Sequence, residues 1–273
     1  RLSDLSQPKL LPTGRLLRRD YDLKLMCLTA FSLRESGRYP FVFAANRDEF
    51  HSRATAPAGW WEDHCDVFGG RDLVAGGSWL AVDRRGRIAA VTNFREQIAA
   101  EYSQSRGKLV ENFLRDSISA ADYVAALQSN LADYGPFNLI LFDGQELHYA
   151  SNRAPKEKLS TNSVYALSNA RLGAAWPKVR YAESRLLDCA ENDELAECLF
   201  KMLRNQSLHG DLPEGADRAA KLRSMVFIND VRYGTRCSTV VLLSRDGELQ
   251  FIERRFTANG IPNGENMESF RIG

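Results

Sequence analysis

Short apolar runs alternate with polar turns along most of the chain, and this pattern predicts β-hairpins. Near the beginning, the runs MCLTAFSL (26–33) and PFVFAAN (40–46) flank a polar turn at 34–39 that contains Gly37. The same arrangement recurs about the turns at 83–86, 143–144 and 245–247. The further strands that we expect are 78–82, 87–92, 137–142, 146–151, 164–168, 238–244 and 248–256.

Apolar residues at spacings of three and four predict helices in two parts of the chain. The expected helices are 107–116, 119–134, 177–191 and 193–204. Ser119 is a suitable N-cap for the second of these, and Pro177 suits the first turn of the third. A Trp- and Gly-rich stretch at 51–77 is expected to be irregular, and a polar stretch at 205–221 is expected to be an exposed loop.

Strands and helices therefore follow one another in blocks, and hairpins join most strand pairs. This order favours mostly antiparallel sheets covered by helices and disfavours a doubly wound parallel sheet. The expected fold class is a layered α+β domain. Neither an internal repeat nor a Gly-, Ser- or Pro-rich linker divides the sequence, so we expect one domain over residues 26–273.

Composition and charge restrict the class of protein. Of the 273 residues, 44% are hydrophobic and 26% are charged, and the net charge is +1. This near-neutral balance argues against a nucleic-acid partner, because phosphate-binding domains usually carry a basic excess. The sequence also has no apolar run long enough for a transmembrane segment.

The segment 1–25 is a basic leader with six basic and three acidic side chains, and the remainder of the chain is slightly acidic. Pro12, Gly14 and several arginines interrupt its apolar pieces, which argues against a secretory signal. We expect that Met26 is the true start of the protein or that the leader is removed. A disordered basic tail and an organelle-targeting peptide are the alternatives.

Five cysteines, at positions 27, 65, 189, 198 and 237, are scattered and contain no CxxC pair. Their spacing indicates neither a disulfide framework nor a zinc site. We therefore expect a reduced, cytoplasmic protein without a bound metal.

Cys27 is the strongest candidate for chemistry, because loss of Met26 would make it the N-terminal residue. A thiol and a free α-amine would then share one carbon atom, and an α-amine with a pKa of about 8 can accept the thiol proton at neutral pH. The rigid start of an apolar strand would hold this nucleophile in place. The alternative is an ordinary buried core cysteine.

Four polar residues, Asn-Arg-Asp-Glu at 46–49, follow the apolar part of the second expected strand. If the first two strands are antiparallel neighbours, this end lies beside Cys27. Asp48 can then hold the α-amine, and Arg47 can lower the pKa of the thiol or bind a substrate carboxylate. The alternative is a charged strand end in solvent. The residues that we assign to substrate binding are Asn46, Arg47, Glu49 and Trp79.

Two asparagines and one arginine complete the set of candidates. Asn93 and Asn169 each end an apolar strand, and amide N–H groups there can stabilise the oxyanion of acyl transfer. The alternative for each asparagine is a turn-forming residue. Arg236 precedes the strand at 237–243, where it is either a cation of the site or a surface charge.

Several longer motifs together resemble one known family. The motifs are MCLTAF, FVFAANRDEF, FGGRDLVAGGSWLAV, VTNFRE, LSNARLGAAWPKVR and YGTRCSTVVLL. In this order they resemble the NRDE family, also called the transport and Golgi organisation 2 family, over residues 26 to about 256. The layout is more distantly similar to the choloylglycine hydrolase group, which implies a four-layer αββα fold of the N-terminal nucleophile hydrolase type.

The more distant resemblance implies roles for individual residues. Cys27 matches the nucleophile, Asp48 the aspartate that holds the α-amine, and Arg236 the late arginine of those hydrolases; Asn93 and Asn169 match the asparagines near the oxyanion. The chain departs from the pattern three residues before Asp48, where those hydrolases have an arginine and this sequence has Ala45. Arg47 can replace that cation only with a bulge or turn, since consecutive strand residues face opposite sides.

Two classes of function follow. In the one that we favour, the protein is an amidohydrolase that acts on a non-peptide C–N bond of a small molecule and needs no cofactor. In the other, which the NRDE resemblance implies, it is a non-catalytic carrier of haem, lipid or acyl-CoA. Apolar walls for haem are offered by Trp60, Trp61, Phe68 and Trp79, and iron ligands by His51, His64, Cys65 and His148. A scaffold role in secretion ranks last, because the sequence has no coiled coil, repeat or basic amphipathic helix.

Overall fold

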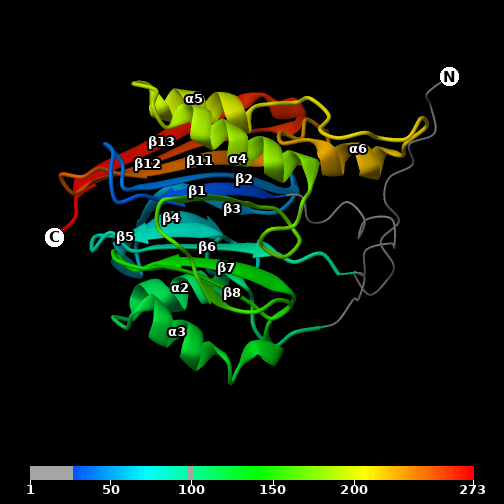
Figure 1. The fold of residues 1–273 in the computed structure, drawn as a ribbon. Helices are drawn as coiled ribbons and strands as arrows, with labels where there is room; N and C mark the ends of the chain where they lie inside the picture. Colours follow the sequence, from blue (N-terminus) through cyan, green and yellow to red (C-terminus); the bar gives the residue numbers. More distant parts are fainter. Residues whose placement is uncertain (1–26, 97–100) are drawn as a thin grey trace.

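The computed structural model describes residues 27–96 and 101–273, so the leader at 1–25 and Met26 lie outside the described residues. Two β-sheets lie face to face in the middle of the molecule, and helices cover their outer faces (Figure 1). Within both described sheets every pair of neighbouring strands is antiparallel. The predicted α+β fold class, a four-layer αββα sandwich of antiparallel sheets, is confirmed.

The first sheet has six strands in the order β10-β1-β2-β11-β12-β13. Their bounds are β1 Leu28–Leu33, β2 Phe41–Phe50, β10 Ser163–Leu167, β11 Tyr233–Leu243, β12 Glu248–Phe256 and β13 Pro262–Arg271. Strands β1 and β2 are neighbours, with Leu28 opposite Asn46. This register brings the start of β1 beside residues 46–49, as the sequence predicted.

The second sheet has seven strands that follow in chain order from β3 to β9. Their bounds are β3 Thr55–Trp61, β4 His64–Asp72, β5 Leu80–Asp83, β6 Ile88–Asn93, β7 Phe137–Phe142, β8 Leu147–Ser151 and β9 Glu157–Lys158. Short turns join most of these strands. A helical insertion between β6 and β7 covers the outer face.

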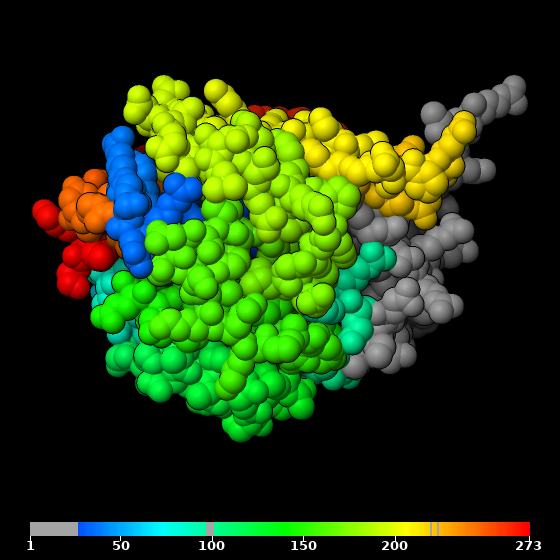
Figure 2. Space-filling model, in the orientation of Figure 1, coloured from blue at the N-terminus to red at the C-terminus, as the bar shows by residue number. Residues whose placement is uncertain are grey.

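Helices form the two outer layers. The helices α4 Pro177–Cys189 and α5 Leu195–Leu203 pack on the first sheet, and α2 Gly107–Arg115 packs on the second together with α3 Ala120–Leu127. The smaller elements are α6 Arg218–Ser224, η1 Leu131–Asp133 and η2 Ala258–Gly260. Figure 2 shows the yellow-green helical layer and the green segments below it covering this side of the sandwich. Among the described residues, no helix is both long and apolar enough to cross a membrane.

Aromatic side chains fill the space between the two sheets. Phe41 and Phe43 on β2 point inward and stack against each other, and Phe41 also stacks on Phe142 of the opposite sheet with ring centroids 4.5 Å apart. Phe68 of β4 meets Phe251 of β12 edge to face. Because these rings come from both sheets, they fix how the sheets face each other.

Several expected elements are wrong. The stretch at 51–77 contains β3 and β4 instead of an irregular segment, and its strand signal is weak because register shifts interrupt the pairing. Strand β13 was not expected, since its residues are mostly polar and exposed. The stretch at 205–221 includes the start of α6, and the helix expected at 119–134 ends at Leu127.

The expectation that no cysteines pair is also wrong. Cys189 ends α4 and Cys198 lies in α5, and the two are joined by a disulfide with their Cα atoms 5.6 Å apart. A tight connection folds α5 back beside α4, which brings together two cysteines nine positions apart. The sequence spacing alone has no feature that marks this pair. Cys27, Cys65 and Cys237 are free.

Candidate functional site

Cys27 precedes β1 and lies half-buried at one end of the sandwich. Ser168, just after β10, donates a hydrogen bond of 2.8 Å to the Cys27 carbonyl oxygen, and the Cys27 Sγ lies 3.8 Å from the Asp48 carbonyl oxygen. The residue borders a narrow inter-sheet cavity of about 20 Å³, whose other walls include Arg47 and Trp79. A thiol therefore faces an apolar slot between the sheets.

Burial makes this thiol a poor nucleophile by itself. Loss of hydration and the nearby Asp48 carboxylate raise the pKa of Cys27 to about 12. The backbone of Asp48 and the Arg47 guanidinium act in the opposite direction but do not compensate. The thiol is thus protonated at neutral pH unless a base next to it accepts the proton.

Asp48 is buried behind Cys27, on the face of β2 that meets the helices. Its Oδ1 accepts a hydrogen bond of 2.6 Å from the Thr235 hydroxyl of β11, whereas its Oδ2 has no hydrogen-bond partner within the described part of the chain. Burial raises the pKa of Asp48 to about 6, and the Lys178 ammonium is the largest opposing influence. A buried carboxylate oxygen without a donor is costly, which marks a place for one more N–H group.

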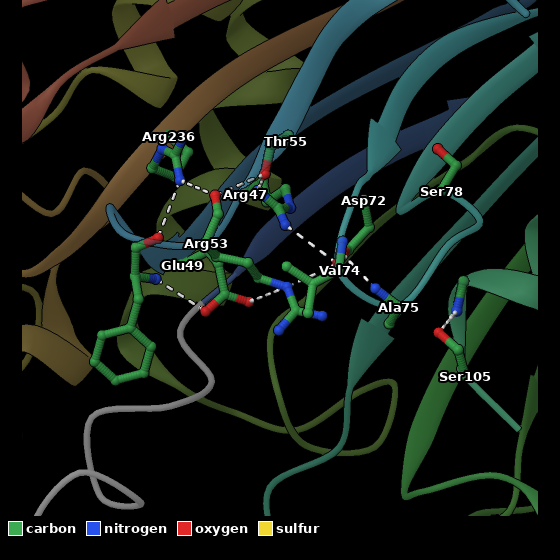
Figure 3. A network of polar contacts seen from close by, with 12 residues as sticks. Arg47, Glu49, Arg53, Thr55, Asp72, Val74, Ala75, Ser78, Ser105 and Arg236 are labelled. Atoms are coloured by element: carbon green, nitrogen blue, oxygen red, sulfur yellow. Dashed lines mark hydrogen bonds and ion pairs between the residues drawn. The ribbon is translucent and has the colours of Figure 1, made fainter. Parts of the chain in front are cut away.

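Arg47 points the other way, into the space between the sheets. Its guanidinium stacks over the Trp79 ring at 4.2 Å. It also donates to the Thr55 hydroxyl at 3.2 Å and lies 3.7 Å from Asp72 (Figure 3). Gly70 leaves the room that the Trp79 ring occupies, since a Cβ there would lie 2.2 Å from it. Arg47 and Asp48 therefore take opposite faces of β2, and Cys27 lies at the strand end where it interacts electrostatically with both.

Strand β11, the neighbour of β2, has a bulge opposite Arg47 and Asp48. Thr235 lies opposite Asp48 and Cys237 lies opposite Arg47, so Arg236 is the extra residue in β11. Its guanidinium donates to the carbonyl oxygens of Phe50 and Arg53, both at 3.0 Å. Arg236 thus holds the segment that follows β2 and belongs to the polar network of Figure 3; direct action on substrate stays a prediction.

Positive charge exceeds negative charge around the cavity mouth. Arg53 pairs with Asp72 at 2.8 Å and lies 3.8 Å from Glu49, which also accepts a hydrogen bond from the Phe50 backbone. Arg106, just before α2, interacts electrostatically with Glu49, Arg53 and Cys27. Among the described residues, the guanidiniums of Arg47, Arg53, Arg106 and Arg236 outnumber the carboxylates of Glu49 and Asp72 at this mouth, and Glu253 of β12 also interacts with Arg47. This excess favours a ligand with a negatively charged group.

The two candidate oxyanion asparagines lie next to each other. Asn169 is fully buried after β10 and donates its amide to the Asn93 carbonyl oxygen at 2.8 Å. Its own carbonyl oxygen accepts from the Arg95 backbone. Asn169 therefore positions the end of β6, while the half-buried Asn93 side chain makes none of the hydrogen bonds found among the described residues. Of the two amides, that of Asn93 is the one available to an oxyanion.

Asn46 has a different environment from that of a ligand-binding residue. Its amide donates to the carbonyl oxygens of Leu203 and Val226 at 2.8 and 2.9 Å, and its oxygen accepts from the Ser238 hydroxyl at 2.6 Å. Every polar atom of this buried side chain is thus bonded within the protein. Its assignment to substrate binding stays a prediction that this geometry does not favour.

We expect Asn46→Ala to lower the free energy of unfolding by about 3 kcal/mol, because buried acceptors lose their donors. Substrate KM should change little in the folded fraction. Denaturant unfolding measures the first quantity, and Asn263→Ala, at an exposed asparagine of β13, is the matched control. A normal stability with a raised KM would restore the substrate-binding assignment.

The candidate haem ligands do not lie together. His51 follows β2 near the cavity mouth, where its ring bonds the Asp230 carbonyl oxygen, but His64 and Cys65 begin β4 at the far end of that strand. His64 is therefore about 25 Å along β4 from Asp72 at the mouth. His148 lies in β8 and bonds Glu146. Among the described residues no group of three His, Cys, Asp or Glu side chains could hold a metal ion.

The candidate haem walls are packed into two different layers. Phe68 is buried between the sheets, with Trp60 and Trp79 packed against that core. Trp61 instead contacts the helical layer over the second sheet. The four rings therefore do not line one cavity, and haem binding stays a prediction.

Lys178 is a buried charged residue beside the site that the sequence did not predict. It lies in the first turn of α4 with 1% of its surface exposed, on the same helix face as the buried Val179, Ala182 and Leu186. Its ammonium interacts with Asp48 and with Cys27. A lysine on the apolar stripe of a helix is a detectable signal, because lysine is almost never fully buried without a charged partner.

Comparison with known proteins identifies relatives over most of the chain. The family described as Transport and Golgi organisation 2 matches residues 26–258. The human Transport and Golgi organization protein 2 homolog is 30% identical over 255 residues, covering 84% of this chain and 92% of that protein. The Drosophila melanogaster Transport and Golgi organization protein 2 is 27% identical over 270 residues, covering 88% and 95%. The family resemblance read from the sequence motifs is confirmed.

Solved structures with a similar arrangement are more distant. A mutant conjugated bile acid hydrolase from Clostridium perfringens has a TM-score of 0.44 at 12% identity, covering 90% of this chain and 92% of that chain. A Caenorhabditis elegans N-acylethanolamine-hydrolyzing acid amidase ortholog has a TM-score of 0.39 at 12% identity, covering 79% and 92%.

Proposed function

Because the chain belongs to the Transport and Golgi organisation 2 family, whose motif residues surround Cys27, we propose a function built on that cysteine. The protein is a cysteine amidohydrolase of the N-terminal nucleophile type that cleaves a non-peptide C–N bond. The observation that carries the proposal is the pairing of Cys27 with Asp48, whose buried Oδ2 lacks a donor among the described residues. A free α-amine on Cys27 supplies an N–H donor at this place.

The reaction has two stages. The Cys27 α-amine takes the thiol proton, the thiolate attacks the amide carbonyl carbon, and the side chain of Asn93 donates to the oxygen that becomes negative. The C–N bond breaks and the α-ammonium gives its proton to the leaving amine, which leaves an acyl thioester on Cys27. A water molecule, deprotonated by the α-amine, then attacks the thioester and releases the carboxylic acid and the thiol.

The electrostatics support an α-amine as the base. A thiol whose pKa is about 12 needs a base in direct contact, and an unperturbed α-amine has a pKa of about 8. Asp48 orients that amine through a hydrogen bond, as a carboxylate does for the base of other nucleophilic enzymes. Removal of the chain before Cys27 is therefore a condition of activity.

The surroundings favour a particular kind of substrate. Apolar walls such as Phe43, Leu80 and Ala90 line the narrow cavity beside the thiol, while the guanidiniums gather at its mouth. This combination suits an amide with a slender apolar acyl group and a negatively charged group elsewhere.

Acyl trapping tests the proposal directly. The purified protein is treated with p-nitrophenyl acetate, an activated acyl donor, and its mass is measured intact and after digestion. We expect a chain that begins at Cys27 and carries one acetyl group there, removable with hydroxylamine as a thioester is. An active protein that retains residue 26, or acylation confined to other side chains, would falsify the proposal.

The carrier function has less support from the geometry. His51 follows β2, His64 begins β4 and His148 lies in β8, and the aromatic residues offered as walls belong to two packing layers. Haem titration followed in the Soret region tests this alternative, and a shift abolished by replacing His51 and the other three candidate ligands would favour it over hydrolysis.

A further inference from the structure

A buried lysine, Lys178, lies on the side of Cys27 that faces the helices of the first sheet. Lys178 is almost completely buried in α4, a helix that packs over β1 and β10, and Asp48 projects from β2 towards the same layer. Burying an ammonium ion is strongly unfavourable unless a charged partner compensates. The Asp48 carboxylate is such a partner, and it is the same group that our proposed function uses to hold the α-amine.

We propose that Lys178 is a positioning residue that keeps the Cys27 α-amine unprotonated, and therefore basic, by competing with it for the Asp48 carboxylate. The inference rests on the proposed function. Two cations and one carboxylate in a buried site carry a net positive charge, so the site releases one proton readily. Burial in this shared site lowers the pKa of both cations, and the α-amine releases the proton first because its ordinary pKa starts about two units below that of lysine.

The direction of each pKa shift agrees with this competition. Burial lowers the pKa of Lys178 to about 8, and Asp48 is the main influence that keeps it from falling further. Asp48 in turn is kept ionised chiefly by Lys178 and by the Thr235 hydroxyl. Once the thiol proton has moved to the α-amine, the Lys178 ammonium and the α-ammonium face the Asp48 carboxylate and the Cys27 thiolate. This electrically balanced state is the reactive one.

Other charged groups also face the site and are unchanged by a substitution at Lys178. From β2 these are Arg47 and Glu49, and from the segment before α2 it is Arg106. His209, after α5, faces Lys178, and burial together with the Lys178 charge lowers the pKa of the imidazole below its ordinary value. At Cys27, Arg47 lowers the pKa of the thiol and Glu49 raises it by a smaller amount.

The pH dependence of Cys27 alkylation tests the inference without a substrate. Iodoacetamide reacts with the thiolate, so the rate rises as the amine and thiol pair loses its proton. Every protein tested also carries Cys65→Ser, which removes the exposed free cysteine. Mass spectrometry of the Cys27 peptide measures the alkylation rate and shows where the chain starts. Lys178→Met should move the inflection to higher pH by about one unit or more, whereas Lys178→Arg should restore it.

Lys201→Met, which removes an exposed lysine from α5, is the matched control and should leave the inflection in place. A Lys178→Met profile that is lower at every pH but unshifted would overturn the inference, because a merely structural role has that effect. Failure of an Arg or Met variant to fold is visible by circular dichroism, and Lys178→Gln then takes its place. If Lys178→Met shifts the alkylation inflection as expected but the protein hydrolyses no amide, the result would count against the proposed hydrolase and not against this inference.

Discussion

Cys27→Ala is expected to lower kcat/KM for amide hydrolysis by about 10⁴-fold or more, the range found when a nucleophile is removed from an enzyme of this kind. The variant keeps the α-amine, Asp48 and the cavity, so it retains substrate binding but cannot form the thioester. Initial rates and the mass of the acylated protein measure the two effects. Folding should be preserved, because alanine removes only one half-buried sulfur atom.

Two matched variants make this result specific. Cys65→Ala changes an exposed free cysteine of β4 and should leave turnover unaltered. Cys27→Ser keeps a weak nucleophile beside the same amine and should fall between the wild-type protein and Cys27→Ala. If Cys27→Ala hydrolyses the amide at the wild-type rate, Cys27 is not the nucleophile and the proposed function is lost.

Asp48→Asn is expected to lower kcat by roughly 10²- to 10⁴-fold, the usual contribution of a well-oriented base. The neutral amide holds the α-amine less firmly than a carboxylate does. The amide also does not stabilise the protonated form of the Cys27 α-amine, so the pKa of that amine falls. The acid limb of the pH–rate profile should therefore move to lower pH. Lys178→Met should move the same limb to higher pH, and the opposite signs distinguish the two roles.

Stability measurements separate this loss from unfolding. Because the pKa of Asp48 is raised from 3.8 to about 6 in the folded protein, its contribution to stability is present at low pH and is lost as the pH rises through 6. That slope should be shallower in Asp48→Asn. At neutral pH the variant leaves Lys178 buried without its carboxylate, so adding Lys178→Met should recover stability but not turnover. Recovery of both would show that Asp48 acts only on folding.

The relation between β1 and β2 could be predicted from the sequence, because it follows from local signals. Two apolar runs separated by a Gly-containing turn form neighbouring antiparallel strands, and that pairing alone puts Cys27 beside residues 46–49. The alternation of side chains also predicted that Arg47 and Asp48 could share the thiol only at an irregular point. The bulge at Arg236 lies in the adjacent strand, and the two side chains nevertheless remain on opposite faces.

Long-range contacts account for most of what the sequence did not predict. Lys178 is 151 positions from Cys27 in the printed sequence, and only the packing of α4 over β1 brings the two near each other. The Cys189–Cys198 disulfide depends on the turn between two helices, and β3 and β4 depend on partners that tolerate an irregular register. Such features are set by tertiary packing, to which periodicity and residue propensity are insensitive.

The last strand, β13, has a consequence for self-association. It lies beyond the family match at 26–258 and pairs with β12 along the border of the first sheet. A chain without it would present the unpaired N–H and C=O groups of β12 beside Phe251, a template for strand addition by another copy. With β13 in place, the free border is a polar strand whose Glu265 is paired with Arg254. Strand β13 thus places mostly polar, exposed side chains at this border of the described sheet, where a continuous sheet between molecules would have to form.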